Sequence, residues 1–175
     1  MFPATRSQAM ALLGRVGAPP RLIRHAELVG EAADALIGGL RPLELGIHSD
    51  LIRVGAALHD VGKTLHPDEL ERPGSAHEPA GERLLLSAGA TPEVARICRT
   101  HAQWRGPGVS IEELFVALSD KLWKGARVTE LEDLVVDRVA GDLRRDRWEV
   151  FLLLDPLFEE VAAGADDRLG RSAVV

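Results

Sequence analysis

The sequence predicts an all-α helical bundle, and three observations support that prediction. Apolar residues recur at three- and four-residue spacing along nearly the whole chain, and no segment alternates as a half-buried strand does. Residues that start or stop helices, mostly Ser, Thr, Pro and Gly, separate the periodic segments. A chain of 175 residues with 46% hydrophobic residues is long enough for one domain with a core that needs no disulfide.

Three helices are expected before the middle of the chain. Glycines and prolines resist helix continuation and should end the first two, the second of them at Gly38-Gly39. The third should be capped by Ser49 or Asp50, and it is apolar on most sides, which places its C-terminal end in the core. These helices comprise residues 5–16, 21–37 and 51–61.

A loop with at most one helical turn is expected over residues 62–76, because this stretch is rich in proline and glycine. Of the helices that follow, Thr91-Pro92 opens one, and Ser110 with Glu113 forms a capping box for the next. Asp155-Pro156 should kink the last helix, and the tail after about Gly164 should fray. The remaining helices with expected bounds comprise residues 77–86, 129–145 and 146–162.

Composition narrows the class of protein. The net charge of -6 argues against a nucleic-acid-binding surface, since phosphate backbones select basic faces. The single cysteine, Cys98, excludes an internal disulfide, fits a reducing compartment and is expected to be a small buried hydrophobe. No apolar run has transmembrane length and no export signal is evident, so we expect a cytoplasmic protein without a membrane partner.

His59-Asp60 stands at the end of the apolar run Ala56-Ala57-Leu58 and is the centre of the chemistry that we expect. An imidazole nitrogen beside a carboxylate oxygen suits divalent ions, and a buried carboxylate without a partner would be costly. Further residues of these types lie at helix ends or on inward faces, whereas His48 and His66 are expected in loops. The candidate metal ligands are His25, His59, Asp60, His77, His101 and Asp120.

This ordered set resembles the HD superfamily of metal-dependent phosphohydrolases, whose pattern is a histidine, a His-Asp pair and a later aspartate. The resemblance runs from about His25 to Arg127 and implies an HD-domain helical bundle. The matching segments are Leu58-His59-Asp60-Val61-Gly62-Lys63, His77-Glu78-Pro79-Ala80-Gly81-Glu82-Arg83-Leu84 and Ser119-Asp120-Lys121-Leu122. The domain division expected from it is an N-terminal helix and lead-in (1–20), the HD core (21–128), C-terminal helices on that core (129–165) and a tail (166–175).

The resemblance also implies a metal centre. His25, His59, Asp60 and Asp120 would form its first metal site. The additional His77 and His101 resemble the binuclear branches of the superfamily, in which the aspartate corresponding to Asp60 bridges two ions. Bacterial hydrolases that split dinucleoside tetraphosphates symmetrically have the same six-residue set. We therefore expect two divalent ions per chain, whose identity (Fe, Mn, Ni, Co or Zn) these ligand types do not fix.

The implied activity is hydrolysis of a phosphoester or phosphoanhydride bond in a small, phosphorylated, nucleotide-type substrate by metal-bound hydroxide. Asp60 would bridge the metals and orient the hydroxide, and Lys63 would stabilise negative charge on the phosphate. Lys124 and Arg127 follow Asp120 closely enough to hold a phosphate. Trp104 could stack on a base, although all three tryptophans, Trp104, Trp123 and Trp148, are expected to pack within the bundle.

Three alternatives remain open at this stage. Cyclic-dinucleotide phosphodiesterases of the superfamily share the run from His101 to Gly106, but they carry a second histidine where this chain has Thr100, and a tyrosine where it has Pro107. Di-iron oxygenases of the superfamily use a closely similar ligand set, and redox-active iron without phosphatase activity would favour them. A regulatory module that binds nucleotide without metal is the third, and the intact His59-Asp60 pair argues against it.

Overall fold

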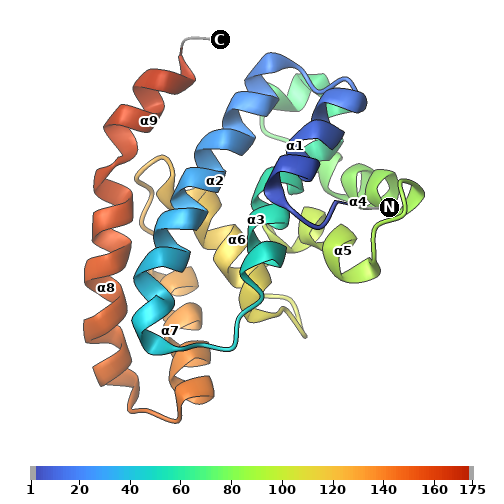
Figure 1. Ribbon diagram of the computed structural model, residues 1–175. Coiled ribbons are helices and arrows are strands. Elements are labelled where there is room, and N and C mark those ends of the chain that lie inside the picture. Colours follow the sequence, from blue (N-terminus) through green and yellow to red (C-terminus); the bar gives the residue numbers. More distant parts are fainter. Residues whose placement is uncertain (1–2, 174–175) are drawn as a thin grey trace.

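A computed structural model describes residues 3–173, which form α-helices joined by turns and short 3-10 helices (Figure 1). No strand occurs in this range, so the all-α prediction is confirmed. None of the helices described there is long and apolar enough to cross a membrane. In chain order the elements are α1 (Arg6–Arg15), α2 (Pro20–Leu40), η1 (Arg41–Leu43), α3 (Ser49–Leu58), η2 (Val61–Thr64), η3 (Pro67–Leu70), α4 (His77–Ser87), α5 (Pro92–Thr100), α6 (Ile111–Leu122), α7 (Thr129–Leu143), α8 (Arg147–Ala163) and α9 (Ala165–Ser172).

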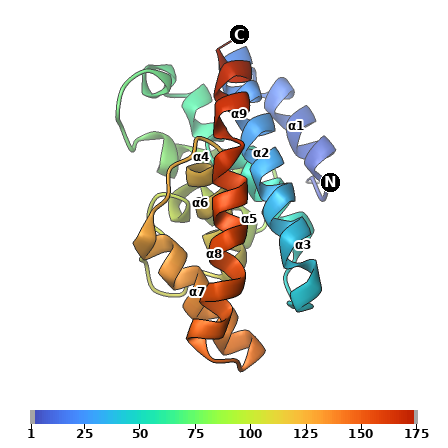
Figure 2. The same cartoon turned by 90° about the vertical axis from the view of Figure 1, so that its left-hand side faces the viewer.

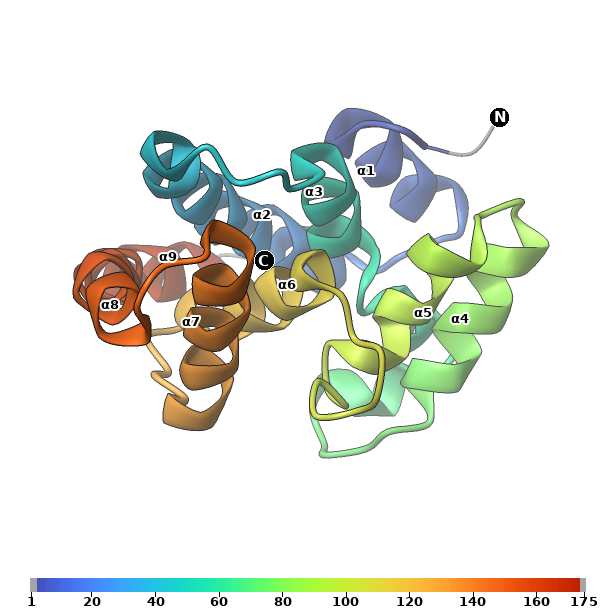
Figure 3. The same ribbon diagram turned by 90° about the horizontal axis from the view of Figure 1, so that it is seen from below.

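Two clusters of buried apolar side chains form the core. One joins α2, α3 and α6 to α7 and α8, and the other joins α1 and the first half of α2 to α3, α4 and α5. Figure 3 shows this division, with α7 and α8 on one side, α4 and α5 on the other, and α3 and α6 between them. Because α3 contributes Ile52 and Ala56 to the first cluster and Val54, Ala57 and Leu58 to the second, its C-terminal end is fixed from both sides.

Helix α2 continues through the glycine pair that was expected to end it. Leu40 is buried at its last turn, and α8 packs so closely on the helix that a Cβ atom on Gly39 would overlap the Leu157 side chain. Close packing therefore explains this glycine, which is needed for its small size and does not stop the helix. At the start of α3, the capping position is occupied by His48, and Ser49 is already the first helical residue.

The expectation that the tail frays after about Gly164 is wrong for the described residues, because α9 is helical through Ser172 and lies against α2. Figure 2 shows α9 continuing upward from α8 alongside the N-terminal half of α2. The buried Arg168 guanidinium donates to backbone carbonyls of Leu122, Trp123 and Val161. These contacts tie α9 to the ends of α6 and α8; residues 174 and 175 of the expected tail lie outside the described residues.

Two smaller expectations also change. The stretch 62–76 contains more structure than one turn, since η2 and η3 both fall at or within it. Trp148 does not pack in the core: its exposed fraction is 60%, and its ring stacks on that of Phe151 at the surface of α8. The Thr91 cap and the Ser110 capping box are confirmed. Helix α3 ends at Leu58, before the expected end at residue 61.

Candidate metal centre

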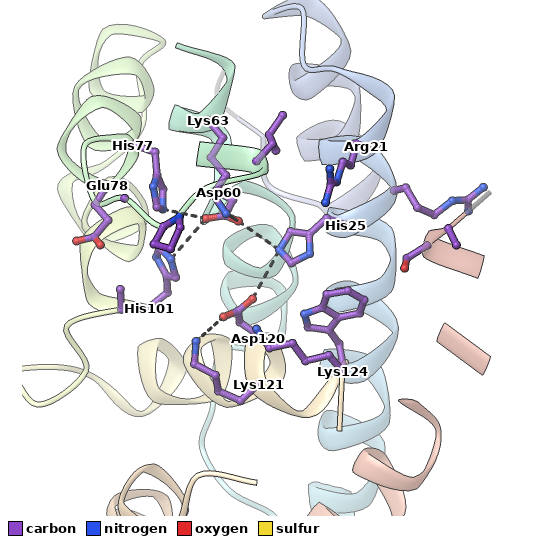
Figure 4. Close-up of a pocket in the computed structure, with 18 residues that line it drawn as sticks. Arg21, His25, Asp60, Lys63, His77, Glu78, His101, Asp120, Lys121 and Lys124 are labelled. Atoms are coloured by element: carbon purple, nitrogen blue, oxygen red, sulfur yellow. Dashed lines mark hydrogen bonds and ion pairs between the residues drawn. The ribbon is translucent and has the colours of Figure 1, made fainter. Parts of the chain in front are cut away.

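The six expected ligands converge although they come from five elements of the chain, and Figure 4 shows five of them, all but His59. His25 lies on the second turn of α2, and Asp120 lies near the end of α6. The end of α3 delivers the adjacent His59 and Asp60, both buried. His77 is the first residue of α4, and His101 caps the end of α5.

Asp60 lies between two groups of histidines and presents a different oxygen to each. Its Oδ2 atom is 3.3 Å from His25 Nε2 and 3.6 Å from His59 Nε2. Its Oδ1 atom is 3.1 Å from His77 Nε2 and 3.5 Å from His101 Nε2. Asp120 completes the first group, because its Oδ1 atom lies 3.6 Å from both His25 Nε2 and His59 Nε2.

Hydrogen bonds on the outer side of three rings fix which nitrogen faces inward. His59 Nδ1 lies 3.0 Å from the carbonyl of Ala56, and His101 Nδ1 lies 3.2 Å from the carbonyl of Ile97. A carbonyl oxygen only accepts, so each Nδ1 is the donor, and in the neutral ring Nε2 keeps its lone pair. His77 Nδ1 is held in the same way by a carboxylate of the preceding loop. The rings are thus oriented as metal-ligating histidines are.

The donor set fits divalent metal ions. His77 Nε2 is buried and makes no hydrogen bond, since its 3.1 Å approach to Asp60 lacks hydrogen-bond geometry. Two triplets bring their ligand atoms within 4.8 Å of one another, namely His25-His59-Asp120 and His59-Asp60-His101. His77 belongs to neither triplet and reaches the cluster through Asp60. Imidazole nitrogens and carboxylate oxygens suit Zn, Fe, Mn and related ions.

Electrostatics favour the ionised forms of the two aspartates and the neutral form of His101, whereas burial of His59 and His77 is outweighed by their neighbouring carboxylates, which raise the pKa of both rings. Burial opposes ionisation of Asp60, but the adjacent His59, His25 and His77 rings outweigh it and hold the Asp60 pKa well below its usual value. Burial likewise opposes ionisation of Asp120, and the nearby His59 ring and Lys121 ammonium reverse the effect, so this pKa is also lowered. Burial lowers the pKa of His101 to about 4, which keeps its ring neutral at pH 7.

The cluster opens into a cavity of about 920 Å³ whose wall is rich in cations. Lys63 Nζ is 2.6 Å from Asp60 Oδ2, and Lys121 Nζ is 2.8 Å from Asp120 Oδ2. Lys124 has no carboxylate within 4 Å among the described residues, so its charge is available to a ligand. The cationic residues of the wall are Arg21, Arg24, Lys63, Lys121 and Lys124. The same wall carries the carboxylates of Asp60, Glu78 and Asp120, so cationic side chains outnumber acidic ones around the cavity in a chain of net charge -6.

Of the expected substrate-binding residues, Lys63 and Lys124 line the cavity and two others do not. Trp104 is buried and borders a separate surface depression, with the Arg105 guanidinium over its ring. Arg127 does not line the cavity either: ion pairs with Glu132, Asp155 and Glu159 hold it against α7 and α8. Neither Trp104 nor Arg127 therefore faces the cavity in this structure, and their expected contacts with a substrate stay predictions.

The structure adds residues to the site that the sequence interpretation missed. Arg21 precedes His25 by four residues in α2, so helical spacing could have placed both on one face. Arg24 directly precedes His25 in the sequence, and Lys121 directly follows Asp120. Glu69, the carboxylate behind His77, lies in the proline-rich loop, and no periodic pattern points to it. His48 and His66 lie in loops outside the cluster, as expected.

The chain is similar to known proteins over part of its length. Ribonuclease Y of Thermosipho melanesiensis is 34% identical over 104 residues, and ribonuclease Y of Thermotoga petrophila is 32% identical over 104 residues. These matches cover 58% of this chain but 19% and 20% of the relatives, so the chain spans about a fifth of the length of the curated relatives it matches. No solved structure matches. The HD domain matches residues 22–124, which is more than half of the chain and includes all six converging ligands, and the chain therefore belongs to the HD domain family.

Proposed function

We propose that this protein hydrolyses a phosphoanhydride or phosphoester bond in a small nucleotide-type substrate, with two divalent metal ions per chain. Membership of the HD family implies metal-dependent phosphohydrolase activity. The observation that carries the finer proposal is the position of Asp60, which presents one carboxylate oxygen to each of two histidine groups at the base of a cationic cavity.

Each residue has a role in this reaction. His25, His59, Asp120 and Asp60 Oδ2 would hold one ion, and His77, His101 and Asp60 Oδ1 the other. Such ions supply Lewis acidity and an activated water. Asp60 fixes the distance between the two positions. Lys63, which lies beside Asp60, donates to a phosphate oxygen and stabilises the negative charge that develops there.

The cavity favours a substrate with several phosphates. Arg21 and Arg24 line it from α2, and Lys121 and Lys124 line it from the end of α6, so cations border the cluster on more than one side. Within the HD family we therefore rank a dinucleoside tetraphosphate first. A cytoplasmic location, with which the free and buried Cys98 is compatible, belongs to the same proposal.

RNA is the second candidate substrate. The relatives that match residues of this chain are named ribonuclease Y, which makes an RNA phosphodiester a specific possibility for this site. The net charge of -6 favours the small substrate, because a polymer contacts surface well beyond the cavity. The cyclic-dinucleotide phosphodiesterase and the di-iron oxygenase remain alternatives within the HD superfamily, and metal-free nucleotide binding remains the alternative outside catalysis.

A substrate panel tests the proposal. Protein loaded separately with Fe²⁺, Mn²⁺, Co²⁺, Ni²⁺ or Zn²⁺ would be assayed with a dinucleoside tetraphosphate, a cyclic dinucleotide and a short RNA. We expect water to split the tetraphosphate into two nucleoside diphosphates, and Lys63→Ala to lower kcat by about 100-fold while metal binding is kept. Cleavage of RNA alone would replace the proposal by its second candidate. Oxygen consumption by the iron form without any hydrolysis would overturn it.

A further inference from the structure

Glu69 lies behind His77, on the side of the ring that faces away from the metal cluster. Its Oε2 atom is 2.5 Å from His77 Nδ1 and 3.2 Å from the His77 backbone nitrogen. Its Oε1 atom accepts a hydrogen bond of 3.0 Å from the backbone N–H of Ala76. Both oxygens of one carboxylate are therefore engaged by the same short stretch of chain, which includes a residue of the cluster.

His77 needs such a partner because of its place in the helix. The rings of His59 and His101 are held by carbonyls three and four residues earlier, within the helices that they end. His77 is the first residue of α4 and has no earlier turn of its own helix to supply a carbonyl. Glu69, eight residues earlier in the loop, supplies the acceptor in its place.

The carboxylate also has little freedom to move. The residue before α4, Ala76, offers no side-chain cap, and Glu69 accepts the free backbone N–H groups at this end of the helix. Gly74 packs directly on Glu69, since a Cβ atom on this glycine would overlap the carboxylate. The Glu69 side chain is thereby fixed by the helix end on one side and by its own loop on the other.

The contact determines the tautomer of His77. An ionised carboxylate only accepts hydrogen bonds, so Nδ1 carries the proton and, in the neutral ring, Nε2 keeps its lone pair. That Nε2 atom is buried, has no hydrogen-bond partner and lies 3.1 Å from Asp60 Oδ1. His77 is also the cluster histidine outside both close ligand triplets. Its correct orientation therefore decides whether the second group can bind an ion.

We propose that Glu69 is a positioning residue for the second metal ion, acting by holding His77 with Nδ1 protonated and Nε2 directed at the cluster. The inference rests on the proposed two-metal function, because it assumes that Nε2 of His77 binds a metal ion. A carboxylate that holds a metal-ligating histidine in this manner changes metal affinity by about 10- to 100-fold in known sites.

The test is Glu69→Gln, with Glu71→Gln as the matched control. The amide cannot satisfy His77 Nδ1–H and both backbone N–H groups together, because one end of it is itself a donor. Glu71 lies in the same loop, is exposed, and makes one long pair of 3.9 Å with Arg21. The two variants have the same change in charge and volume, and circular dichroism of each would verify the helical fold.

Two readouts are independent of activity. Metal titration should show that one of the two ions binds about 10- to 100-fold more weakly in Glu69→Gln, and that both ions bind normally in Glu71→Gln. Nitrogen-15 NMR of metal-free protein should show His77 protonated at Nδ1 in the wild type, and a loss of that single tautomer in Glu69→Gln.

Two results would overturn the proposal. One is that each ion binds Glu69→Gln as tightly as it binds the wild type, and the other is a wild-type His77 protonated at Nε2 alone. If no phosphate substrate is cleaved while Glu69→Gln still weakens one ion, the proposed function fails and the role of Glu69 stands.

Discussion

At the scale of single residues, the cations near the ligand cluster fall into two groups, according to whether carboxylates already bind them. Lys124 lines the cavity and has no carboxylate within 4 Å among the described residues. Arg127, three residues later, has ion pairs of 2.6–2.7 Å with three carboxylates, which come from α7 and α8. A cation that is already saturated in this way serves the fold, whereas a cation facing the cavity is available to the substrate.

A pair of alanine variants separates these two roles. Lys124→Ala should raise KM by about 10- to 100-fold, because it removes one charge-assisted hydrogen bond to the substrate. Arg127→Ala should leave KM unchanged and should lower the free energy of unfolding by roughly 1–2 kcal/mol, since partly exposed ion pairs contribute about 0.2–1 kcal/mol each. Steady-state kinetics and urea denaturation measure the two effects. A raised KM in Arg127→Ala would show that Arg127 does contribute to substrate binding.

The sequence could predict which histidines and aspartates converge but not what surrounds them, and particular residues explain the difference. His59, Asp60 and Asp120 are recognisable because a carboxylate on a buried helix face requires a partner, and their order along the chain resembles one family. Trp104 and Arg127 were placed by their closeness in sequence to His101 and Asp120. Both residues lie beyond the ends of α5 and α6, where helical spacing no longer applies, so tertiary packing sets the direction of their side chains.

At the scale of elements, the close contact of η2 with α4 holds the two halves of the cluster together. Gly62 follows Asp60 by two residues, and a Cβ atom there would overlap the backbone carbonyl of His77 and the backbone nitrogen of Gly81. The absence of a side chain at Gly62 therefore lets the two ligand-bearing segments approach. Sequence reasoning treated Gly62 as a loop residue and Gly38-Gly39 as a helix stop, because a local pattern does not reveal which glycines lie against another element.

Two glycine substitutions test this account of packing. Gly62→Ala should lower the free energy of unfolding by about 3 kcal/mol and weaken metal binding, since backbone atoms cannot move aside as a flexible side chain can. Gly38→Ala should stabilise the protein by about 0.5–1 kcal/mol, because Gly38 is helical and a Cβ atom there meets nothing within 4 Å. Chemical denaturation of both variants gives the comparison. Equal stability of Gly62→Ala and the wild type would show that the contact is not tight.

At the scale of the whole molecule, the C-terminal helices complete the fold around α2 and α6. Arg168 of α9 is buried and donates to carbonyls at the ends of α6 and α8, where no further turn of those helices satisfies them. Burial lowers the pKa of this guanidinium. The last turn of α6, which carries Asp120, is thus supported by a residue from the far end of the chain.

Removing this support should affect the entire fold. Arg168→Ala should cost about 2–3 kcal/mol, since it leaves three buried carbonyls without their charged donor, and should lower Tm by about 5–10 °C. Arg171→Ala removes the more exposed pairs with Glu31 and Asp167 and should lower Tm much less. Thermal denaturation compares the two variants. A larger fall in Tm for Arg171→Ala than for Arg168→Ala would contradict the claim that Arg168 supports the fold.

The central claim is that Asp60 joins two metal positions, and metal content per chain tests it most directly. Wild-type protein purified without chelator would be compared with Asp60→Ala and with Asp68→Ala, whose aspartate is exposed in η3. We predict close to two ions per chain in the wild type and in Asp68→Ala, and a loss of metal in Asp60→Ala. A wild-type chain that binds no metal, even after reloading with Fe²⁺, Mn²⁺ or Ni²⁺, would contradict the account, and a single ion unaffected by Asp60→Ala would do so equally.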